Sequence, residues 1–501
     1  MGSRELYYGD NLDILRGRIK DESIDLCYID PPFNSDTDYN MIYNNIDTGA
    51  VDRAQAQAFV DTWRWDARAQ AGYEEIVFGG GFTAHTVDLV AGLHKLLKEG
   101  PMLAYLVSMT LRITEIHRVL KPTGSFYLHC DPTASHYLKL VCDAIFCGGR
   151  GGVFRNEIIW CYRKWSVKQP QFASNHNNIF FYTKTRNNRF NTLFAELSPG
   201  TVKRWKGQKQ QAAFDDGGKR MATICGEKSK GSPMGDWWEI SVINPNAKER
   251  RGYDTQKPEA LLERIIKASS NEGDVVLDAY CGCGTSVAVA EKLGRQWIGI
   301  DITYQAISVI LQRIKDMFGE QVAGQVDLGG IPKDMASATA LANKRDDRVR
   351  KEFEKWAILT YTDNKGAVKE IKGADGGIDG QVNFMVGHNE SAKMVLQVKS
   401  GGVSRSDVAK LNSDRQREGA EMAVLITLRE PSAPMKVEAA AAGTYHHPWG
   451  RDCPRVCIVT VEEMINGKRM DMPSAITAVR SAKKTSKGRQ EQTNSLAIPS
   501  R

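Results

Sequence analysis

The sequence predicts an α/β protein of two units, the larger built on a doubly wound, mainly parallel sheet and the smaller on a second sheet. Three observations favour this. The 501 residues are too many for one hydrophobic core. Apolar strand-like runs alternate with helical patterns as far as Phe318, which is typical of a parallel sheet with crossover helices. A Gly-, Ala- and Asp-rich stretch then leads into a segment of different composition.

The larger unit is expected to alternate strands and helices in chain order. We expect strands over 6–8, 24–29, 125–130, 275–277 and 297–300. Helices are expected over 11–16, 103–120, 134–146, 286–293, and from 258 to a stop at 271–273. The polar residues 35–95 are interpreted as an irregular insertion, and 154–247 as a region of poor periodicity.

The first motif, Asp30-Pro31-Pro32-Phe33, ends the apolar run 24–29. Two consecutive prolines hold a stiff, extended loop with exposed carbonyls. Asp30 and the Pro31 carbonyl can accept both hydrogens of a planar substrate's amine, while Phe33 offers a face for stacking. The motif therefore predicts a catalytic loop for a flat, amine-bearing substrate, with an ordinary strand end and polyproline turn as the alternative.

The second motif is a Gly-containing loop between a buried strand and a helix, with Asp301 closing the next strand. This arrangement is typical of nucleotide-binding folds, where such an acid binds the ribose. Cys281 and Cys283 lack a partner pair, so small packing residues are favoured over a metal site. The loop residues predicted to bind a cofactor are Asp278, Tyr280, Cys281, Gly282, Gly284 and Thr285.

Clustered positive charge indicates a polyanionic partner. The net charge is +7, and residues 200–231 hold eight Lys/Arg against three acids. Just before them, Trp160, Tyr162 and Trp165 interleave with basic residues, so aromatic rings can stack on bases while cations meet phosphates. The region 154–247 is the candidate DNA-reading region, with a small satellite core and solvated rim as the alternative.

The two motifs together resemble those of the β-class DNA amino-methyltransferases over most of residues 4–318. The matching segments are 9–12, 30–34, 255–258 and 278–285, with Ala279 where the family usually has proline. The resemblance implies a Rossmann-like fold that uses S-adenosyl-L-methionine (SAM) to methylate a flipped base in double-stranded DNA. It implies that Asp10 faces the SAM adenine, Asp301 the ribose, and the Gly loop with Lys257 the methionine end. Asp rather than Ser before the prolines resembles the adenine-N6 group rather than the cytosine-N4 group.

After a linker over 319–347, residues 348–472 are expected to form a smaller α/β domain. Asp379 ends a Gly-rich turn, and Gln397 and Lys399 share one face of the strand 395–399. These three residues resemble the catalytic triad of the Mrr-like branch of the PD-(D/E)xK restriction-endonuclease fold. The resemblance implies that Asp379 and Gln397 bind Mg²⁺, and Glu352 or Glu354 is a candidate further ligand.

Two readings of the C-terminal domain stay open. In one it cuts DNA, as in a single-chain restriction–modification system. In the other it has lost activity, or was never a nuclease, and only binds DNA or a partner. An RNA or protein amino-methyltransferase is the third functional class. The metal-like spacing of His446, His447, Cys453 and Cys457 is not expected to hold zinc, because Cys457 falls in a strand.

The composition predicts a cytoplasmic protein. The ten cysteines form no disulfide framework, and no apolar run is long enough to cross a membrane. No secretory signal is expected at the N-terminus. The basic tail 473–501 is interpreted as disordered, and a homodimer is left open as the assembly.

Overall fold

The computed structural model describes most of the chain, with gaps. The described residues are 3–32, 38–41, 56–60, 63–163, 170, 172–214, 217, 219–244, 247, 249–251, 255–332, 334–343, 347–363, 366–368, 377–386, 391–448 and 451–471. Phe33, Trp165 and the tail 473–501, which carry predictions above, lie outside them.

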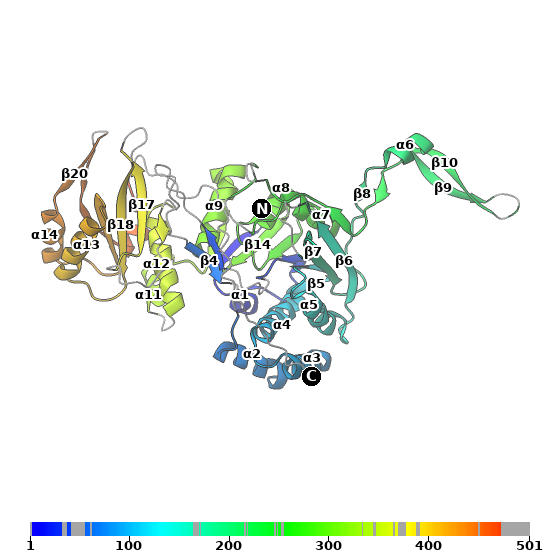
Figure 1. Ribbon diagram of the computed structural model, residues 1–501, viewed down its shortest axis with the longest axis horizontal. Helices are drawn as coiled ribbons and strands as arrows, with labels where there is room; N and C mark the ends of the chain where they lie inside the picture. Colours follow the sequence, from blue (N-terminus) through cyan, green and yellow to red (C-terminus); the bar gives the residue numbers. More distant parts are fainter. Residues whose placement is uncertain are drawn as a thin grey trace, which may run out of the picture.

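A nine-stranded mixed sheet forms the N-terminal unit, in the order β12-β6-β7-β5-β2-β13-β14-β1-β15 (Figure 1). Only β7 runs antiparallel to its neighbours, β5 and β6. The mainly parallel sheet predicted from the sequence is therefore confirmed. The strands are β1 (Arg4–Tyr8), β2 (Ile24–Ile29), β5 (Leu120–Cys130), β6 (Val153–Cys161), β7 (His176–Thr183), β12 (Trp237–Glu239), β13 (Val275–Asp278), β14 (Gln296–Asp301) and β15 (Asp327–Gly329).

Helices cover both faces of this sheet, as doubly wound folds require. Alternate residues of β2 face opposite cores: Cys27 and Ile29 pack into one cluster and Leu26 and Tyr28 into the other. The first cluster is covered by α1 (Asn11–Arg18), α2 (Ala67–Phe78), α3 (Ala84–Leu97), α4 (Pro101–Val119) and α5 (Ser135–Cys142), which continues into a π-turn (Asp143–Cys147). The second is covered by α7 (Glu259–Ser269), α8 (Thr285–Lys292) and α9 (Tyr304–Phe318).

The irregular insertion predicted over 35–95 is wrong for its second half. Residues 67–97 form α2 and α3, and residues before them pair as a hairpin of β3 (Asp38–Met41) and β4 (Ala56–Val60). Asp66 and Thr83 cap the two helices by accepting backbone N–H groups. The buried faces of α2 and α3 contain small residues or few apolar ones, so the helical repeat of apolar residues was weak in the sequence.

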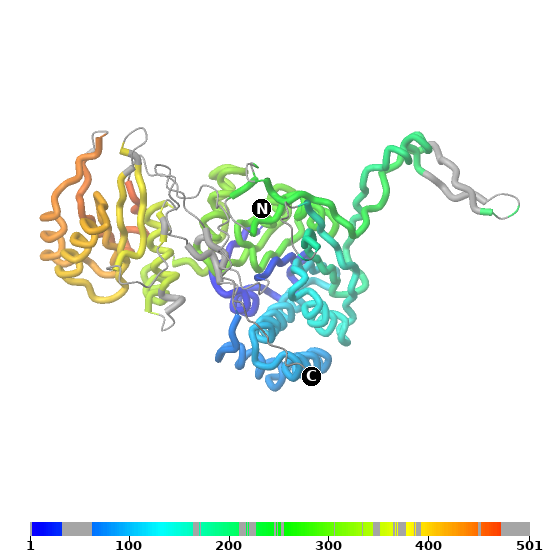
Figure 2. The backbone as a smooth tube through the Cα atoms, in the orientation of Figure 1, coloured from blue at the N-terminus to red at the C-terminus, as the bar shows by residue number. Residues whose placement is uncertain are grey.

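The region 154–247 divides into two parts. Its ends, β6, β7 and β12, belong to the central sheet. Trp160 is 3% exposed, so its ring is part of the core, and for this residue the satellite-core alternative applies and not base stacking. Between β7 and β12, the chain forms an arm that projects away from the sheet. The arm lies on the side of the sheet opposite the C-terminal unit (Figures 1 and 2). The arm contains β8 (Phe194–Ala195), α6 (Pro199–Trp205), β9 (Gln208–Phe214), β10 (Arg220–Lys228) and β11 (Ser232–Pro233).

The segment predicted as a linker carries structure of its own. After the short α10 (Glu320–Ala323), β15 pairs with β1 and extends the central sheet. Farther on, α11 (Met335–Ala342) packs its Ala338 and Ala342 into the core of the C-terminal unit. Residues 319–347 therefore join the two units through packed elements.

The C-terminal unit is a five-stranded sheet in the order β16-β17-β18-β19-β22 with helices on both faces. The unit holds α12 (Asp347–Tyr361), β16 (Ala367–Val368), β17 (Gly380–Met385), β18 (Ser391–Lys399), α13 (Arg405–Arg417), β19 (Met422–Thr427), α14 (Ala433–Ala441), the hairpin of β20 (Thr444–His447) and β21 (Arg451–Pro454), β22 (Val456–Thr460) and α15 (Val461–Ile465). The strand predicted over 395–399 is thus present within β18, and Cys457 lies in β22 as expected.

Candidate active site

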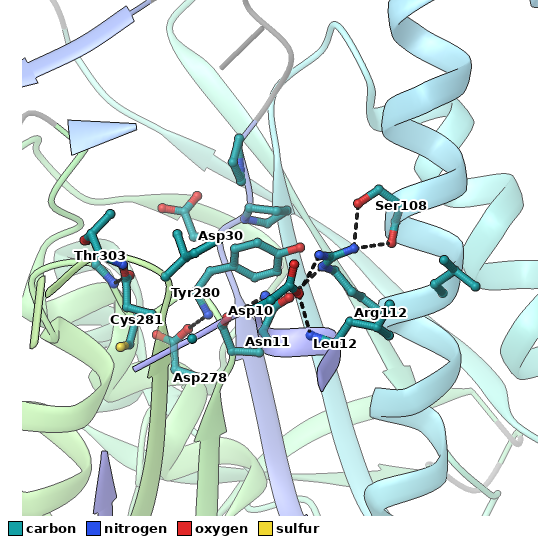
Figure 3. A pocket seen from close by; sticks show the side chains of 18 of the residues that line it. Asp10, Asn11, Leu12, Asp30, Ser108, Arg112, Asp278, Tyr280, Cys281 and Thr303 are labelled. Atoms are coloured by element: carbon teal, nitrogen blue, oxygen red, sulfur yellow. Dashed lines mark hydrogen bonds and ion pairs between the residues drawn. The ribbon is translucent and has the colours of Figure 1, made fainter. Parts of the chain in front are cut away.

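A cavity of about 1160 Å³ opens at the carboxyl ends of the central strands (Figure 3). In open α/β sheets this end of the sheet is where ligands bind. Both predicted motifs reach it, although they lie about half the chain apart. The predicted site residues that line it are Asp10, Asp30, Pro31, Pro32, Lys257, Asp278, Tyr280, Cys281, Gly282, Thr285 and Asp301.

The Gly loop is fixed by hydrogen bonds and by one close backbone approach. The carboxylate of Asp278 accepts from the Tyr280 N–H at 3.0 Å and from the Ser286 hydroxyl. Gly284 has φ +71°, and a Cβ there would lie 2.7 Å from Ile310, so a side chain is excluded at this position. Burial raises the pKa of Asp278 to about 7. The loop is therefore rigid before any ligand arrives.

Asp301 ties the loop to the end of β14. Its Oδ2 accepts from the Gly282 N–H at 2.9 Å, and its Oδ1 accepts from the Thr303 N–H and hydroxyl, each at 2.9 Å. Burial raises the pKa of this carboxyl to about 6. Each carboxylate oxygen can accept more than one hydrogen bond, so Asp301 can still receive a ribose hydroxyl.

A second acid, Asp10, is held by an arginine that the sequence did not reveal. Arg112 of α4 donates from Nη2 to Asp10 Oδ1 at 2.8 Å and from Nε to Asn11 Oδ1 at 2.6 Å (Figure 3). The same Asp10 oxygen caps α1 by accepting from the Leu12 N–H at 2.9 Å. Arg112 comes from a helix 101 residues away from Asn11, so no local pattern could have indicated the contact.

Asp30 lies at the other side of the cavity with one oxygen paired and one unpaired. Its Oδ2 forms an ion pair with Lys257, which also donates to the Thr255 carbonyl at 3.2 Å. Its Oδ1 is buried and has no hydrogen-bond partner in the described part of the chain. Burial raises the pKa of Asp30, and the Lys257 ammonium opposes that rise. The site thus keeps one unsatisfied acceptor beside the cavity, and a buried polar atom of this kind requires a partner.

The predicted nuclease residues also converge in the C-terminal unit. Asp379 Oδ2 accepts from the Val398 N–H at 2.7 Å, and burial raises the pKa of Asp379 to about 7, with Glu354 raising it further and Lys399 lowering it. Gln397 is buried and donates from Nε2 to the Gly377 carbonyl at 2.6 Å. The predicted triad is therefore brought together, with Glu354 near it.

The described residues offer few ligands for the predicted Mg²⁺ site. No group of three or more His, Cys, Asp or Glu side chains able to hold a metal occurs among the described residues. Glu352, one of the two candidate further ligands, is turned toward the N-terminal unit, where it accepts from the Tyr8 hydroxyl at 3.0 Å. The amide nitrogen of Gln397 donates to its backbone partner, which leaves the amide oxygen as its one potential metal ligand. Where the chain is described, Asp379 and Glu354 are thus the carboxylates left near the predicted site.

The fold is Rossmann-like, and the Asp30-Pro31-Pro32 loop faces the Gly loop across one pocket. The chain belongs to the DNA methylase family (N6_N4_Mtase), whose model matches residues 24–312, more than half of its length.

Two similar proteins agree with this assignment. The DNA adenine methyltransferase YhdJ of Escherichia coli (strain K12) is 27% identical over 316 residues, which cover 62% of this chain and 83% of that protein. The type II methyltransferase M.HpaI of Haemophilus parainfluenzae is 31% identical over 206 residues, covering 41% of this chain and 58% of that protein. Among solved structures, a putative DNA modification methylase from Thermus thermophilus, complexed with S-adenosyl-L-methionine, is 14% identical with a TM-score of 0.35 and covers 65% of this chain and 98% of that one.

The C-terminal unit matches a different family model. Residues 350–466 are similar to the NACHT-associated inactive Restriction Endonuclease 1 family. In the described part of the chain, no helix is both long and apolar enough to cross a membrane. Nine cysteines in the described residues are free thiols.

Proposed function

We propose that the protein transfers a methyl group from SAM to the exocyclic amine of a flipped base in double-stranded DNA, with adenine N6 as the acceptor. The observation that carries this proposal is the buried, unpartnered Oδ1 of Asp30 at the cavity that the Gly loop also lines. An amine hydrogen of the target base is the donor that this oxygen lacks.

The residues of the Gly-loop side fit the cofactor. Asp10 and Asp301 present carboxylates suited to the adenine amine and the ribose hydroxyls, and the loop N–H groups together with Thr285 line the same wall. SAM, when bound, supplies an electrophilic methyl group on a sulfonium. The rigid loop then needs little rearrangement to align it.

The chain itself prepares the amine for attack. An amine conjugated to a purine is a poor nucleophile because its lone pair is delocalised into the ring. Hydrogen bonds from both N–H groups to Asp30 and the Pro31 carbonyl favour a pyramidal nitrogen, which frees the lone pair. The target base must first leave the duplex, and Phe33, which lies outside the described residues, is proposed to stack on it.

Adenine is favoured over cytosine by two observations. Asp30, rather than Ser, precedes the prolines. One relative matched over most of its length carries the description DNA adenine methyltransferase. Within the proposed methyltransferase domain, residues 1–318, the region 154–247 is proposed to read the target, with the basic arm contacting the DNA backbone. The homodimer stays a prediction.

The test compares Asp30→Ala with the wild type. Methyl transfer from labelled SAM to duplex DNA should be lost, while the Kd for SAM should stay near the wild-type value, because the Gly loop is intact. Hydrolysis of the wild-type product should yield N6-methyladenine. Methylation of cytosine would overturn the adenine assignment, and transfer to tRNA or peptide exceeding transfer to DNA would overturn the substrate class.

For the C-terminal unit, proposed as the domain 348–472, we propose DNA binding without cleavage. The matched family is described as inactive, and the described carboxylates do not complete a metal site. The Mg²⁺-dependent cleavage by Asp379, Gln397 and Lys399 that the sequence resemblance implied is the untested alternative. Plasmid DNA, methylated or unmethylated, should remain intact with Mg²⁺ or Mn²⁺ and SAM. Cleavage that Lys399→Ala and Asp379→Ala each abolish would instead establish the nuclease.

A further inference from the structure

A histidine that the proposed reaction does not use lies directly behind Asp30. His129 is on β5, which pairs in parallel with β2 in a register that sets Ile29 beside Leu128. His129 therefore lies beside Asp30, one position farther along both strands. Its ring is 0% exposed, and its Nδ1 is 4.0 Å from the unpartnered Oδ1 of Asp30.

Both ring nitrogens of His129 have neighbours that define its proton. Nε2 lies 3.0 Å from Asn177 Nδ2, and the Tyr162 hydroxyl donates to Asn177 Oδ1 at 2.9 Å. With the amide in this orientation Nε2 is the acceptor, so the proton of the neutral imidazole is on Nδ1. Nδ1 faces the Tyr28 hydroxyl at 3.0 Å.

Two features keep the imidazole neutral and fixed. Burial lowers the pKa of His129 well below its usual value, and the nearby Lys257 ammonium lowers it further. Trp160 of β6 packs against the ring edge-on, with centroids 5.4 Å apart. The ring is therefore a fixed hydrogen-bond donor pointing toward the catalytic loop.

This arrangement differs from that of an ordinary core histidine. Tyr28 and Asp30, which its Nδ1 faces, both line the cavity. His129 lies 4.0 Å from Asp30 without a hydrogen bond to it, and on its other side it is linked through Asn177 to Tyr162, inside the region proposed to read DNA. The imidazole thus lies between Asp30 and the hydrogen-bonded pair of Asn177 and Tyr162.

We propose that His129 is a positioning residue for Asp30: together with Tyr28 it orients the unpartnered carboxylate oxygen toward the amine of the target base. Asn177 and Tyr162 hold the imidazole in the required tautomer from behind. This inference rests on the proposed function, because it acts only through the methyl-accepting site. His129 itself exchanges no proton with the substrate.

The test uses His129→Leu, His129→Gln and the matched control His117→Gln in the full chain. His117 is also buried, but it packs against Phe146 and Arg150, away from Asp30. The single-turnover rate of methyl transfer should fall about 10- to 100-fold in His129→Leu, since small misplacements of reacting groups cost this much. His129→Gln, whose amide can still donate, should recover part of the rate. Kd for SAM, Kd for DNA and the unfolding midpoint should stay near wild type.

Tyr28→Phe is a second test that disturbs the fold less, because it removes only the hydroxyl oxygen and keeps the ring. It should also lower the rate with both Kd values unchanged. A wild-type rate in His129→Leu or in Tyr28→Phe would overturn the inference. So would a loss of rate in His129→Leu that is matched by equal losses of SAM and DNA affinity. If Asp30→Ala retains methyl transfer, the proposed function fails instead, and the two failures are thereby distinguished.

Discussion

Lys257 and Asp30, which both line the cavity, form a direct ion pair, although 227 residues separate them in the chain. The sequence resemblance placed Lys257 at the methionine end of the cofactor. The structure brings it to the acid of the catalytic loop, in the same cavity. Lys257 therefore has a second role available to it, which is to keep Asp30 ionised in a buried setting.

Replacing Lys257 should shift the pH dependence of methyl transfer. Burial raises the pKa of Asp30 and Lys257 lowers it. Asp30 accepts a hydrogen bond from the amine only when ionised, so activity is lost as pH falls through its pKa. Lys257→Gln removes the opposing charge, and the acidic limb of the kcat/KM profile should move to higher pH. A profile that moves to lower pH, or does not move, would contradict this role.

Arg112 should matter for cofactor affinity more than for the chemical step. Its contacts at 2.8 Å and 2.6 Å hold Asp10 and Asn11 at the cavity. A hydrogen bond to a charged group contributes about 1.5–3 kcal/mol, so Arg112→Ala should raise the KM for SAM by about 10- to 100-fold. The value of kcat at saturating SAM should change far less. Arg16→Ala is the control, because Arg16 makes only exposed ion pairs with Glu75 and Glu115. A fall in kcat as large as the rise in KM would show that Arg112 and Asp10 act in the chemical step as well as in SAM binding.

The basic arm should contribute phosphate contacts. Lys203 in α6 and Lys206, which follows it, are both exposed. The arm that contains α6 lies far from the C-terminal unit (Figure 1). Each lost phosphate contact lowers the slope of log K against log salt by about 0.9, so Lys203→Gln/Lys206→Gln should flatten the salt dependence of DNA binding.

The exposed pair Lys95 and Lys98 on and after α3 gives a matched control. Lys98 and Lys206 both have positive φ, 56° and 51°, so the two double variants carry the same backbone risk. Lys95→Gln/Lys98→Gln should leave the slope unchanged. Identical slopes for the two double variants would show that the arm does not contact DNA through these lysines.

Local patterns in the sequence were sufficient for five of the nine strands of the central sheet (β1, β2, β5, β13 and β14) and for both motifs. A buried strand followed by two prolines, and a strand–Gly loop–helix–strand unit, each carry their signal within a few residues. What could not be predicted depends on tertiary contacts. Arg112, His129 and the pairing of Lys257 with Asp30 join segments that are distant in the chain. The role of Trp160 stayed open in the sequence because a core tryptophan and a base-stacking one have the same neighbours there.

The last prediction concerns Asp379, whose folded-state pKa is raised to about 7 from 3.8 by burial and by Glu354. A carboxyl with a raised pKa gives stability that is fully present below its unfolded pKa and is lost as pH rises through the folded value. Asp379→Asn keeps an acceptor for the Val398 N–H and cannot ionise. The unfolding midpoint of this variant relative to wild type should therefore increase as pH rises from about 4 to about 8.

Adding Mg²⁺ at the upper pH separates a metal site from a merely buried acid. If the C-terminal unit binds no divalent ion, as its donor set indicates, Mg²⁺ should leave the wild-type midpoint and the difference from Asp379→Asn unchanged. A rise of the wild-type midpoint with Mg²⁺ that Asp379→Asn lacks would instead show a metal bound at Asp379, because a ligand that binds only the folded state stabilises it. A difference that stays constant from about pH 4 to about pH 8 would show that Asp379 has an ordinary pKa. The buried carboxyl would then impose no cost on the fold at neutral pH.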